Sequence, residues 1–396
     1  MKKLIVLIAG VLMQSVLGGV YAWSVFIPSL TSDYGQSNGQ ASLIFGINIA
    51  VFTVVMIPAG RLLGRFSPRK IAFTGALLFS IGYLTASFSG GNFAVILGGI
   101  GIVAGAGIGA GYVCPLTVGM KWFPNNKGLV TGVVVAGFGG GAIALSSLSE
   151  YLLTSLDWNV LEVFRLIGYG FGGLAIAASL FLKEPELSAS KDKIEGREKK
   201  IASNYLLSKP FVMLCTGMFA GTFAGLLVIG NLKPILLSLG LTSEAATLGI
   251  SIFAVGNASG RIIWGQIHDK FGVRPTILAS LAALGLSVVL FAFEMPEPLL
   301  IAATLIAGIN FGACFVVYAS SMVAYFGTEL FPSLYPICFL WYGLAGIIGP
   351  GAGGWIADST GTFTIGVAVS SLTVFAAFAV NAFGLSSPIR AEENTA

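Results

Sequence analysis

The sequence predicts an all-α integral membrane protein with twelve transmembrane helices arranged as two six-helix bundles. The 396 residues are 56% hydrophobic and 10% charged, and the mean hydropathy is +0.90, whereas a soluble domain of this size carries far more charge. Twelve apolar segments are long enough to cross a bilayer as helices. A charged stretch, Lys191–Lys200, separates the sixth segment from the seventh. We therefore expect one bundle at 1–182, a cytoplasmic linker at 183–209 and a second bundle at 210–396.

The apolar segments are expected to be helical because a bilayer offers backbone N–H and C=O groups no other hydrogen-bond partner. The first segment follows Lys2 and Lys3 and resembles a secretory signal peptide with a small-residue cleavage site ending at Ala22. Its apolar run continues to Leu30, which is too long for a signal core, so we expect an uncleaved first span. The approximate ranges are 4–30, 41–60, 71–90, 93–120, 128–150, 162–182, 210–230, 243–267, 275–294, 298–326, 333–357 and 362–386.

Charge differs between the two sides of the predicted bundle. By the positive-inside rule, the basic side is cytoplasmic, which places both termini and the linker in the cytoplasm and the protein in the cytoplasmic (inner) membrane. The net charge of +4 therefore indicates orientation and not nucleic-acid binding. The basic loops contain Lys2, Lys3, Arg61, Arg65, Arg69, Lys70, Lys121, Lys127, the linker residues, Lys270, Arg274 and Arg390. The opposite loops contain Asp33, Asp157, Glu162, Glu294, Glu297 and Asp358, with Arg165 and Lys233 as their basic residues.

Metal and cofactor sites are not expected. The four cysteines lie in apolar segments without paired spacing, so we interpret them as packing residues. The one histidine, His268, is expected in a loop. Gly349–Gly354 matches G-x-G-x-x-G, but it lies in an apolar segment without a preceding strand, so it does not indicate a dinucleotide site. We interpret the glycine-rich runs at 98–111 and 132–141 as helix-packing surfaces.

Arg261 is the one charge in the middle of the span at 243–267. A guanidinium remains protonated at membrane depth and needs a polar or anionic partner. Arg261 lies roughly 12 Å inside the helix end marked by Asp269, at 1.5 Å per residue. Asn257 lies one turn earlier on the same face of the helix. No acidic residue occurs between Glu244 and Asp269. The default interpretation is an anion-binding site; the alternative is a structural arginine that caps carbonyls or extends to the membrane interface.

The two halves of the chain repeat weakly. Gly60–Arg69 follows the second span and Gly265–Arg274 follows the eighth, at an offset of 205 residues. Transporter folds are often built from such repeats, with the binding site between the halves near the bilayer midplane. Both loops resemble the signature loop Gly-x-x-x-Asp-Arg/Lys-x-Gly-x-Arg of the major facilitator superfamily. The second copy is complete, whereas the first has Gly64 where Asp is usual.

Two longer stretches narrow this resemblance. Gly18–Phe26, and Lys121–Gly132 continuing into Ala136–Gly139, are similar to the oxalate/formate antiporter family and its relatives, the monocarboxylate transporters. The resemblance covers essentially the whole chain and implies the major facilitator fold, with its two bundles related by a pseudo-two-fold axis. It also implies that five loop residues take part in the conformational change, namely Arg65, Arg69, Asp269, Lys270 and Arg274.

The resemblance also implies a role for Arg261, because an arginine of the eighth span meets the substrate carboxylate in these families. Bidentate Arg–carboxylate pairing is strong, especially where water is excluded, so Arg261→Lys is not expected to be conservative. Oxalate transporters have a lysine in the eleventh span, whereas this chain has Tyr342 there and no Lys or Arg in that span. Because a second buried carboxylate would be left unpaired, one cation favours a monocarboxylate.

The proton carrier of the animal monocarboxylate transporters is absent from this chain. They usually have an aspartate four residues before the arginine and a lysine in the first span, whereas this chain has Asn257 and no first-span lysine beyond Lys3. A proton could accompany the substrate carboxylate or bind a tyrosine–water network; alternatively, only the loaded carrier crosses, which gives exchange. The sequence leaves symport and exchange open. Glu150 is a conceivable carrier, but we expect it to be a wetted charge at the outer end of its span.

Aromatic residues are expected to shape the rest of the site, because the non-carboxylate end of a substrate needs an apolar wall with few donors. Tyr112, next to a glycine-rich face, is the strongest candidate for a hydrogen-bond donor, and resemblance to bacterial lactate carriers supports a tyrosine here. Tyr21, Phe311, Phe315 and Tyr342 are weaker candidates that could equally be packing residues.

The sequence therefore predicts a secondary transporter of a small carboxylate anion that works as a proton symporter by alternating access. L-Lactate or pyruvate is the expected substrate, and formate is the next candidate. The alternative is an oxalate/formate-type anion exchanger. An integral-membrane enzyme is disfavoured because no nucleophile–base pair or carboxylate dyad is evident. A channel or a sensor built on the same scaffold is a further alternative. We expect the protein to function as a monomer in the lipid bilayer.

Overall fold

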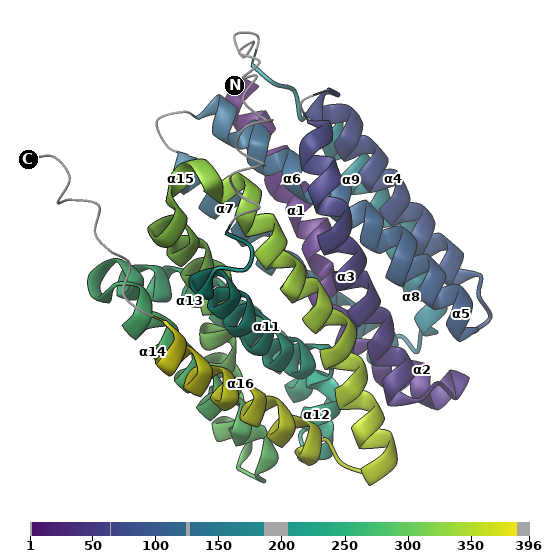
Figure 1. Cartoon of the computed structure of the whole chain (residues 1–396). Coiled ribbons are helices and arrows are strands. Elements are labelled where there is room, and N and C mark those ends of the chain that lie inside the picture. Colours follow the sequence, from purple (N-terminus) through teal and green to yellow (C-terminus); the bar gives the residue numbers. More distant parts are fainter. Residues whose placement is uncertain (1, 64, 124–126, 186–204, 386–396) are drawn as a thin grey trace, which may run out of the picture.

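The computed structural model describes residues 2–63, 65–123, 127–185 and 205–385, which form helices and connecting loops without a strand (Figure 1). Twelve of the helical segments are long and apolar enough to span a membrane. This confirms the predicted all-α membrane fold. The acidic and basic linker stretch Lys191–Lys200, together with Gly64 and Arg390, lies outside the described residues.

The first half of the chain contains six spans, several of which join more than one helical segment. The expected range 93–120, for example, is one span, Phe93–Trp122, in which a π-helical segment lies between two α-helices. The segments are α1 (Lys2–Gly18), η1 (Gly19–Val25), α2 (Ile27–Tyr34), α3 (Asn38–Leu62), α4 (Pro68–Ser87), α5 (Phe93–Ile96), η2 (Leu97–Ala104), α6 (Gly105–Trp122), α7 (Lys127–Glu150), η3 (Tyr151–Ser155), α8 (Val160–Leu166), η4 (Ile167–Phe171) and α9 (Gly172–Ser179).

The second half contains the other six spans. Its longest element, α15, includes two of them, because Gly327 with φ of 77° interrupts the helical backbone between the span that ends there and the span Ser333–Thr360. A positive φ of this kind is accessible to glycine without steric strain. The segments are α11 (Lys209–Gly230), α12 (Leu232–Ser238), α13 (Ser243–Phe271), α14 (Val273–Val289), η5 (Leu290–Ala292), α15 (Glu297–Thr360) and α16 (Thr364–Gly384).

The first span is shorter than the sequence predicts. It ends at Val25 rather than at Leu30, and the remaining apolar residues belong to the separate helix α2. Pro28 lies in the first turn of α2, where its missing N–H removes no helical hydrogen bond, whereas inside a continuous helix it would remove one. The apolar run alone could not locate this break.

Glycines permit close packing at many helix contacts, which confirms the packing interpretation for most of the run at 98–111. In the run at 132–141 it holds for Gly137 and Gly141, which pack against α1, whereas Gly132, Gly139 and Gly140 line a cavity. A Cβ on Gly260 would lie 2.1 Å from the carbonyl oxygen of Ile309, and one on Gly75 would lie 2.7 Å from that of Gly107. The segment Gly349–Gly354 also packs against other helices: a Cβ on Gly354 would lie 2.5 Å from the Asn38 carbonyl oxygen. Such contacts allow backbones to approach closely where lipid offers no hydrophobic driving force.

The bundle has two ends. We call the end at which α1 begins and α13 ends the terminal end, and the end that carries α2 and α12 the distal end (Figure 1). At the distal end, the Asp358 carboxylate accepts hydrogen bonds from the backbone N–H groups of Asn38 and Gly39, at 3.0 and 2.8 Å. Because Asp358 belongs to the second half and α3 to the first, this contact ties the halves together and places an anion at a helix N-terminus.

The terminal end contains the two predicted loops. Arg65, Arg69, Asp269 and Lys270 are exposed there. Arg274 is also exposed, and its Nη2 donates a hydrogen bond of 2.8 Å to the Ala382 carbonyl oxygen. Whether these residues act in the conformational change stays a prediction.

Two expectations about single side chains have different outcomes. The cysteines are buried and free, as the packing interpretation requires. His268 was expected in a loop, but it is buried in the last turn of α13, and its Nε2 lies 3.2 Å from the Ser321 hydroxyl. Helix α13 extends beyond the apolar pattern that suggested its end, and His268 in its last turn packs against Ser321 of α15.

Candidate functional site

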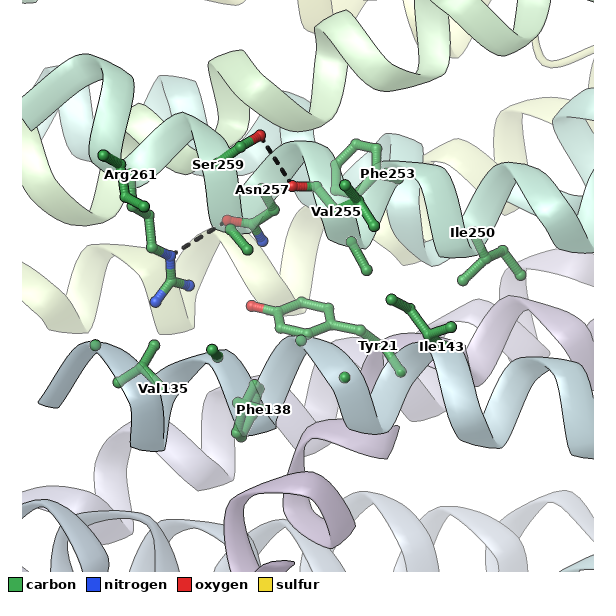
Figure 2. Close-up of a pocket in the computed structure, with 18 of the residues that line it drawn as sticks. Tyr21, Val135, Phe138, Ile143, Ile250, Phe253, Val255, Asn257, Ser259 and Arg261 are labelled. Carbon is green, nitrogen blue, oxygen red and sulfur yellow. Dashed lines mark hydrogen bonds between the residues drawn. The ribbon is translucent and has the colours of Figure 1, made fainter. Parts of the chain in front are cut away.

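A cavity of about 800 Å³ opens between the two halves of the protein. Most of its wall comes from α7 of the first half and α13 of the second, and Tyr21 of η1 and Ile229 of α11 complete it. Figure 2 shows α7 and α13 facing one another, with the side chains of both helices directed into the space between them. A cavity of this size between two bundles is a typical place for a small-molecule site.

Arg261 supplies the charge of this cavity. Its Nε donates a long hydrogen bond of 3.4 Å to Asn257 Oδ1, one turn earlier on α13 (Figure 2). The guanidinium carbon lies 4.6 Å from the centroid of the Phe315 ring, which is the geometry of a cation–π contact. Among the described residues, Arg261 forms no ion pair with an acidic side chain. The remaining guanidinium N–H groups therefore leave room for an anion.

Tyr21 and Tyr342 join the two halves beside Arg261. Their hydroxyl oxygens lie 2.7 Å apart, and either can be the donor. The Tyr342 ring packs edge to face on Phe315, with centroids 5.5 Å apart. Tyr21 faces the cavity (Figure 2), whereas Tyr342 is only 1% exposed and lies behind the wall. The pair thus links α15 to η1 through a buried, satisfied hydrogen bond.

Tyr112 of α6 also approaches the guanidinium. Its hydroxyl is near enough to interact with Arg261, and its ring packs edge to face on Phe52 and Phe138, at 5.3 and 5.4 Å between centroids. Its carbonyl oxygen accepts a hydrogen bond of 3.0 Å from Gln14 Nε2. The ring is therefore held by packing, and the hydroxyl faces the cation.

The seven predicted site residues lie around Arg261, but they differ in whether they reach the cavity. Tyr21, Asn257 and Arg261 line the cavity. Tyr112 and Phe315 contact Arg261 from outside that wall. Phe311 is fully buried and Tyr342 nearly so; the Phe311 ring packs on Phe315 with centroids 5.2 Å apart. Their part in binding stays a prediction.

The sequence reasoning missed the apolar part of the wall. Ile250 and Phe253 precede Arg261 on the face of α13 that includes Asn257, and Phe138 and Ile143 face them from α7. A helical repeat of three to four residues counted back from Arg261 would have found the α13 residues. The α7 residues have no such signal, because only the packing of the two bundles brings α7 opposite α13.

Glu150 is not the wetted interface charge that the sequence suggested. It is 6% exposed and forms an ion pair with Lys233 of α12, which is 3% exposed although its segment had been placed in an outer loop. The same carboxylate oxygen, Oε2, accepts a hydrogen bond of 2.8 Å from the Thr247 hydroxyl of α13, whereas Oε1 has no partner. The prediction was wrong because the other half covers the end of α7.

Comparison with known proteins identifies the class. The family model of the Major Facilitator Superfamily matches residues 8–232 and 212–395, so the chain belongs to this superfamily. Solved structures of the same fold include the xylose transporter XylE from E. coli, with a TM-score of 0.74 at 13% identity, covering 98% of this chain and 100% of that one. A bacterial homologue of the lysosomal transporter Spinster superimposes with a TM-score of 0.76 at 17% identity, covering 96% of each chain. The protein is therefore a membrane transporter and not an enzyme.

Relatives found by sequence similarity narrow the kind of transporter. The oxalate:formate antiporter of Oxalobacter formigenes is 28% identical over 386 residues, which cover 95% of this chain and 90% of that protein. Monocarboxylate transporter 13 of Bos taurus is 24% identical and covers 91% and 84% of the two chains. Apicoplast pyruvate carrier 1 of Toxoplasma gondii is 25% identical and covers 83% and 79%. The antiporter and the monocarboxylate transporter bear the names of the two families that the sequence resembles.

Proposed function

We propose that this protein is a secondary active carrier of small monocarboxylates, with L-lactate and pyruvate as substrates. The observation that carries the proposal is the guanidinium of Arg261 in the cavity between the halves, which contacts Asn257, Phe315 and Tyr112 and has no acidic partner among the described residues. A cation in this setting binds one carboxylate strongly, because the pair is charge-assisted and bidentate and little water competes. The names of the antiporter, pyruvate-carrier and monocarboxylate-transporter relatives support the same substrate class.

Transport would proceed by rocking of the first bundle against the second around this site. The hydrogen bonds identified between described residues of the two halves, from Tyr21–Tyr342 to Asp358–Gly39, lie at the level of the cavity or toward the distal end. These bonds hold the distal side together, so a substrate would leave the cavity toward the terminal end. Exposure to the other side would require the distal contacts to separate.

Proton coupling forms part of the proposal. The cavity wall contains no carboxyl group among the described residues, so a proton would accompany the substrate carboxylate and not an acidic side chain of the wall. The empty site would carry the positive charge of Arg261, the substrate carboxylate would neutralise it, and the accompanying proton would return one positive charge to the loaded site. We also propose that the protein acts as a monomer in the cytoplasmic membrane with both termini in the cytoplasm, as its loop charges indicate.

Uptake of labelled L-lactate into proteoliposomes, with and without an inward proton gradient, tests the proposal. We expect gradient-driven, saturable uptake that pyruvate blocks and oxalate does not. The Arg261→Lys variant, reconstituted at the same density, serves as the matched control because it keeps the charge and loses the planar fork. Near-normal uptake by that variant would remove Arg261 from the binding site.

An oxalate/formate-type exchanger is the second candidate, favoured by the identity to the Oxalobacter antiporter over almost the whole chain. Against it, Arg261 is the one cation among the described residues of the cavity wall. Tyr342, which packs on the same Phe315 ring as Arg261, is a buried hydrogen-bond partner of Tyr21. Uptake that ignores the proton gradient, depends on internal anion and is inhibited by oxalate would establish exchange and overturn the monocarboxylate proposal.

A further inference from the structure

The polar groups of the cavity are concentrated at one end. Arg261 and the amide of Asn257 lie there, whereas Ile250 marks the other end of the α13 wall, roughly 16 Å along the helix at 1.5 Å per residue (Figure 2). The other two polar side chains of the wall are already engaged: the Tyr21 hydroxyl bonds to Tyr342, and the Ser259 hydroxyl donates to the Val255 carbonyl oxygen at 3.0 Å.

The opposite end of the cavity is apolar. Ile143 of α7, Ile229 of α11 and both Ile250 and Phe253 of α13 surround it; Ile143 is half-buried, whereas the other three are at most 2% exposed. A hydroxyl or a second carboxylate of a ligand would find no free hydrogen-bond partner among these side chains and would lose its hydration. A methylene group would instead leave water for an apolar wall, which is favourable. The volume of about 800 Å³ is in the range that holds drug-sized ligands and exceeds the needs of a three-carbon acid.

We infer that the preferred substrate is a monocarboxylate with an unbranched or branched apolar tail of several carbons. Its carboxylate pairs with Arg261, and its tail extends along α13 past Phe253 toward Ile250 and Ile143. This inference rests on the proposed function and narrows it: L-lactate and pyruvate are the short members of the substrate class, and longer apolar acids bind more tightly.

The affinity is expected to depend on the number of carbons in the apolar tail. Burial of one methylene group contributes about 0.8 kcal/mol, which corresponds to about a fourfold increase in affinity because 1.4 kcal/mol is a factor of ten. The affinity of straight-chain carboxylates should therefore rise about fourfold for each added carbon, until the tail reaches the isoleucines. A dicarboxylate of the same length should bind far more weakly, since its second charge would enter the apolar end.

Calorimetric titration of the full-length purified protein with straight-chain monocarboxylates of two to eight carbons tests this. The primary alcohols of the same lengths, which lack the carboxylate, measure partition into detergent. Ile143→Ala removes apolar side-chain atoms from the wall at a half-buried position. Ile250→Ala removes them at a fully buried position. Leu248→Ala, on the exposed face of α13 away from the cavity, is the matched control.

We expect the rise in affinity with chain length in the wild type and in Leu248→Ala, and a flatter rise in Ile143→Ala and Ile250→Ala with the affinity for acetate unchanged. Equal affinity for all chain lengths, together with loss of binding in Arg261→Gln, would overturn the apolar-tail inference and leave the proposed function intact. A rise with chain length that persists in Arg261→Gln, or that the alcohols reproduce, would show nonspecific partition and would also overturn it. Full binding of pyruvate and acetate by Arg261→Gln would contradict the proposed function itself.

Discussion

Glu150 and Lys233, 83 positions apart in the sequence, form a buried ion pair that joins α7 of the first half to α12 of the second. The Thr247 hydroxyl of α13 donates a hydrogen bond to the same carboxylate. Breaking a buried pair by removing one partner leaves an uncompensated charge, whereas replacing both by neutral groups of similar volume can be neutral or stabilising. The pair therefore affects both the stability of the fold and the closure of its distal end.

Lys233→Met should destabilise the protein strongly, because Glu150 would remain buried without a cation. We expect a loss of about 3–5 kcal/mol of unfolding free energy, measured by SDS titration of the detergent-solubilised protein. The double variant Glu150→Gln/Lys233→Met should recover most of this loss. A double variant as unstable as the single one would show that packing, and not charge, determines the effect.

The same double variant should open the distal end more often, because one of the contacts that hold the halves together is gone. Ser251, which lies 3.4 Å from Ser146 of the other half, can be replaced by cysteine as a reporter, since the native cysteines are buried. Labelling of Ser251→Cys by a membrane-impermeant maleimide should be several-fold faster in the double variant. Labelling of Thr360→Cys, at an exposed distal position, should not change. Equal rates at Ser251→Cys in both backgrounds would exclude a role of the pair in closure.

Arg261→Lys should weaken substrate binding about 10- to 100-fold, which corresponds to the loss of one charge-assisted hydrogen bond of about 1.5–3 kcal/mol. The lysine ammonium keeps the charge but cannot form the bidentate pair or the planar contact with Phe315. The measurement is the affinity for pyruvate by competition against labelled L-lactate in proteoliposomes. Retention of wild-type affinity would favour the alternative of a structural arginine at this position.

Tyr21→Phe and Tyr342→Phe should each lower the unfolding free energy by about 1 kcal/mol, because the remaining hydroxyl is left buried without its partner. The double variant should lose less than the sum, with a coupling of about 0.6 kcal/mol, as is typical of hydrogen bonds between membrane helices. SDS titration of the four proteins gives this cycle. Strict additivity would mean that the 2.7 Å contact contributes nothing to the association of the halves.

Tyr342→Lys should change the selectivity toward dicarboxylates. The new ammonium would lie near Arg261 and, being buried, would need a second anionic group. We therefore expect oxalate to inhibit labelled L-lactate uptake in this variant at concentrations that leave the wild type unaffected. Tyr342→Met, similar in length and uncharged, controls for loss of the hydroxyl. Oxalate inhibition of the wild type to the same degree would contradict the argument from a single cation.

Local composition was sufficient to predict the twelve membrane spans, whereas the relation between the two bundles was implied by the resemblance to the major facilitator superfamily. The apolar segments predicted the twelve spans to within a few residues, except for the break after Val25, which depends on Pro28 and on packing. Arg261 was identifiable for a related reason: a lone charge in an apolar helix has few structural explanations. Asn257 followed from helical periodicity, and both lie in the cavity.

The contacts between the halves could not be predicted in this way. Tyr21 and Tyr342 are 321 positions apart, and no local pattern indicates which α7 residues face α13. Glu150 was misplaced for the same reason, since its position near a helix end indicates a wet environment only if no other element covers that end. Composition and periodicity thus determined the helices and the cation Arg261 within one of them, because those depend on the solvent around each segment. Only the tertiary structure decided which side chains meet across the interface, because that depends on the relative placement of two bundles.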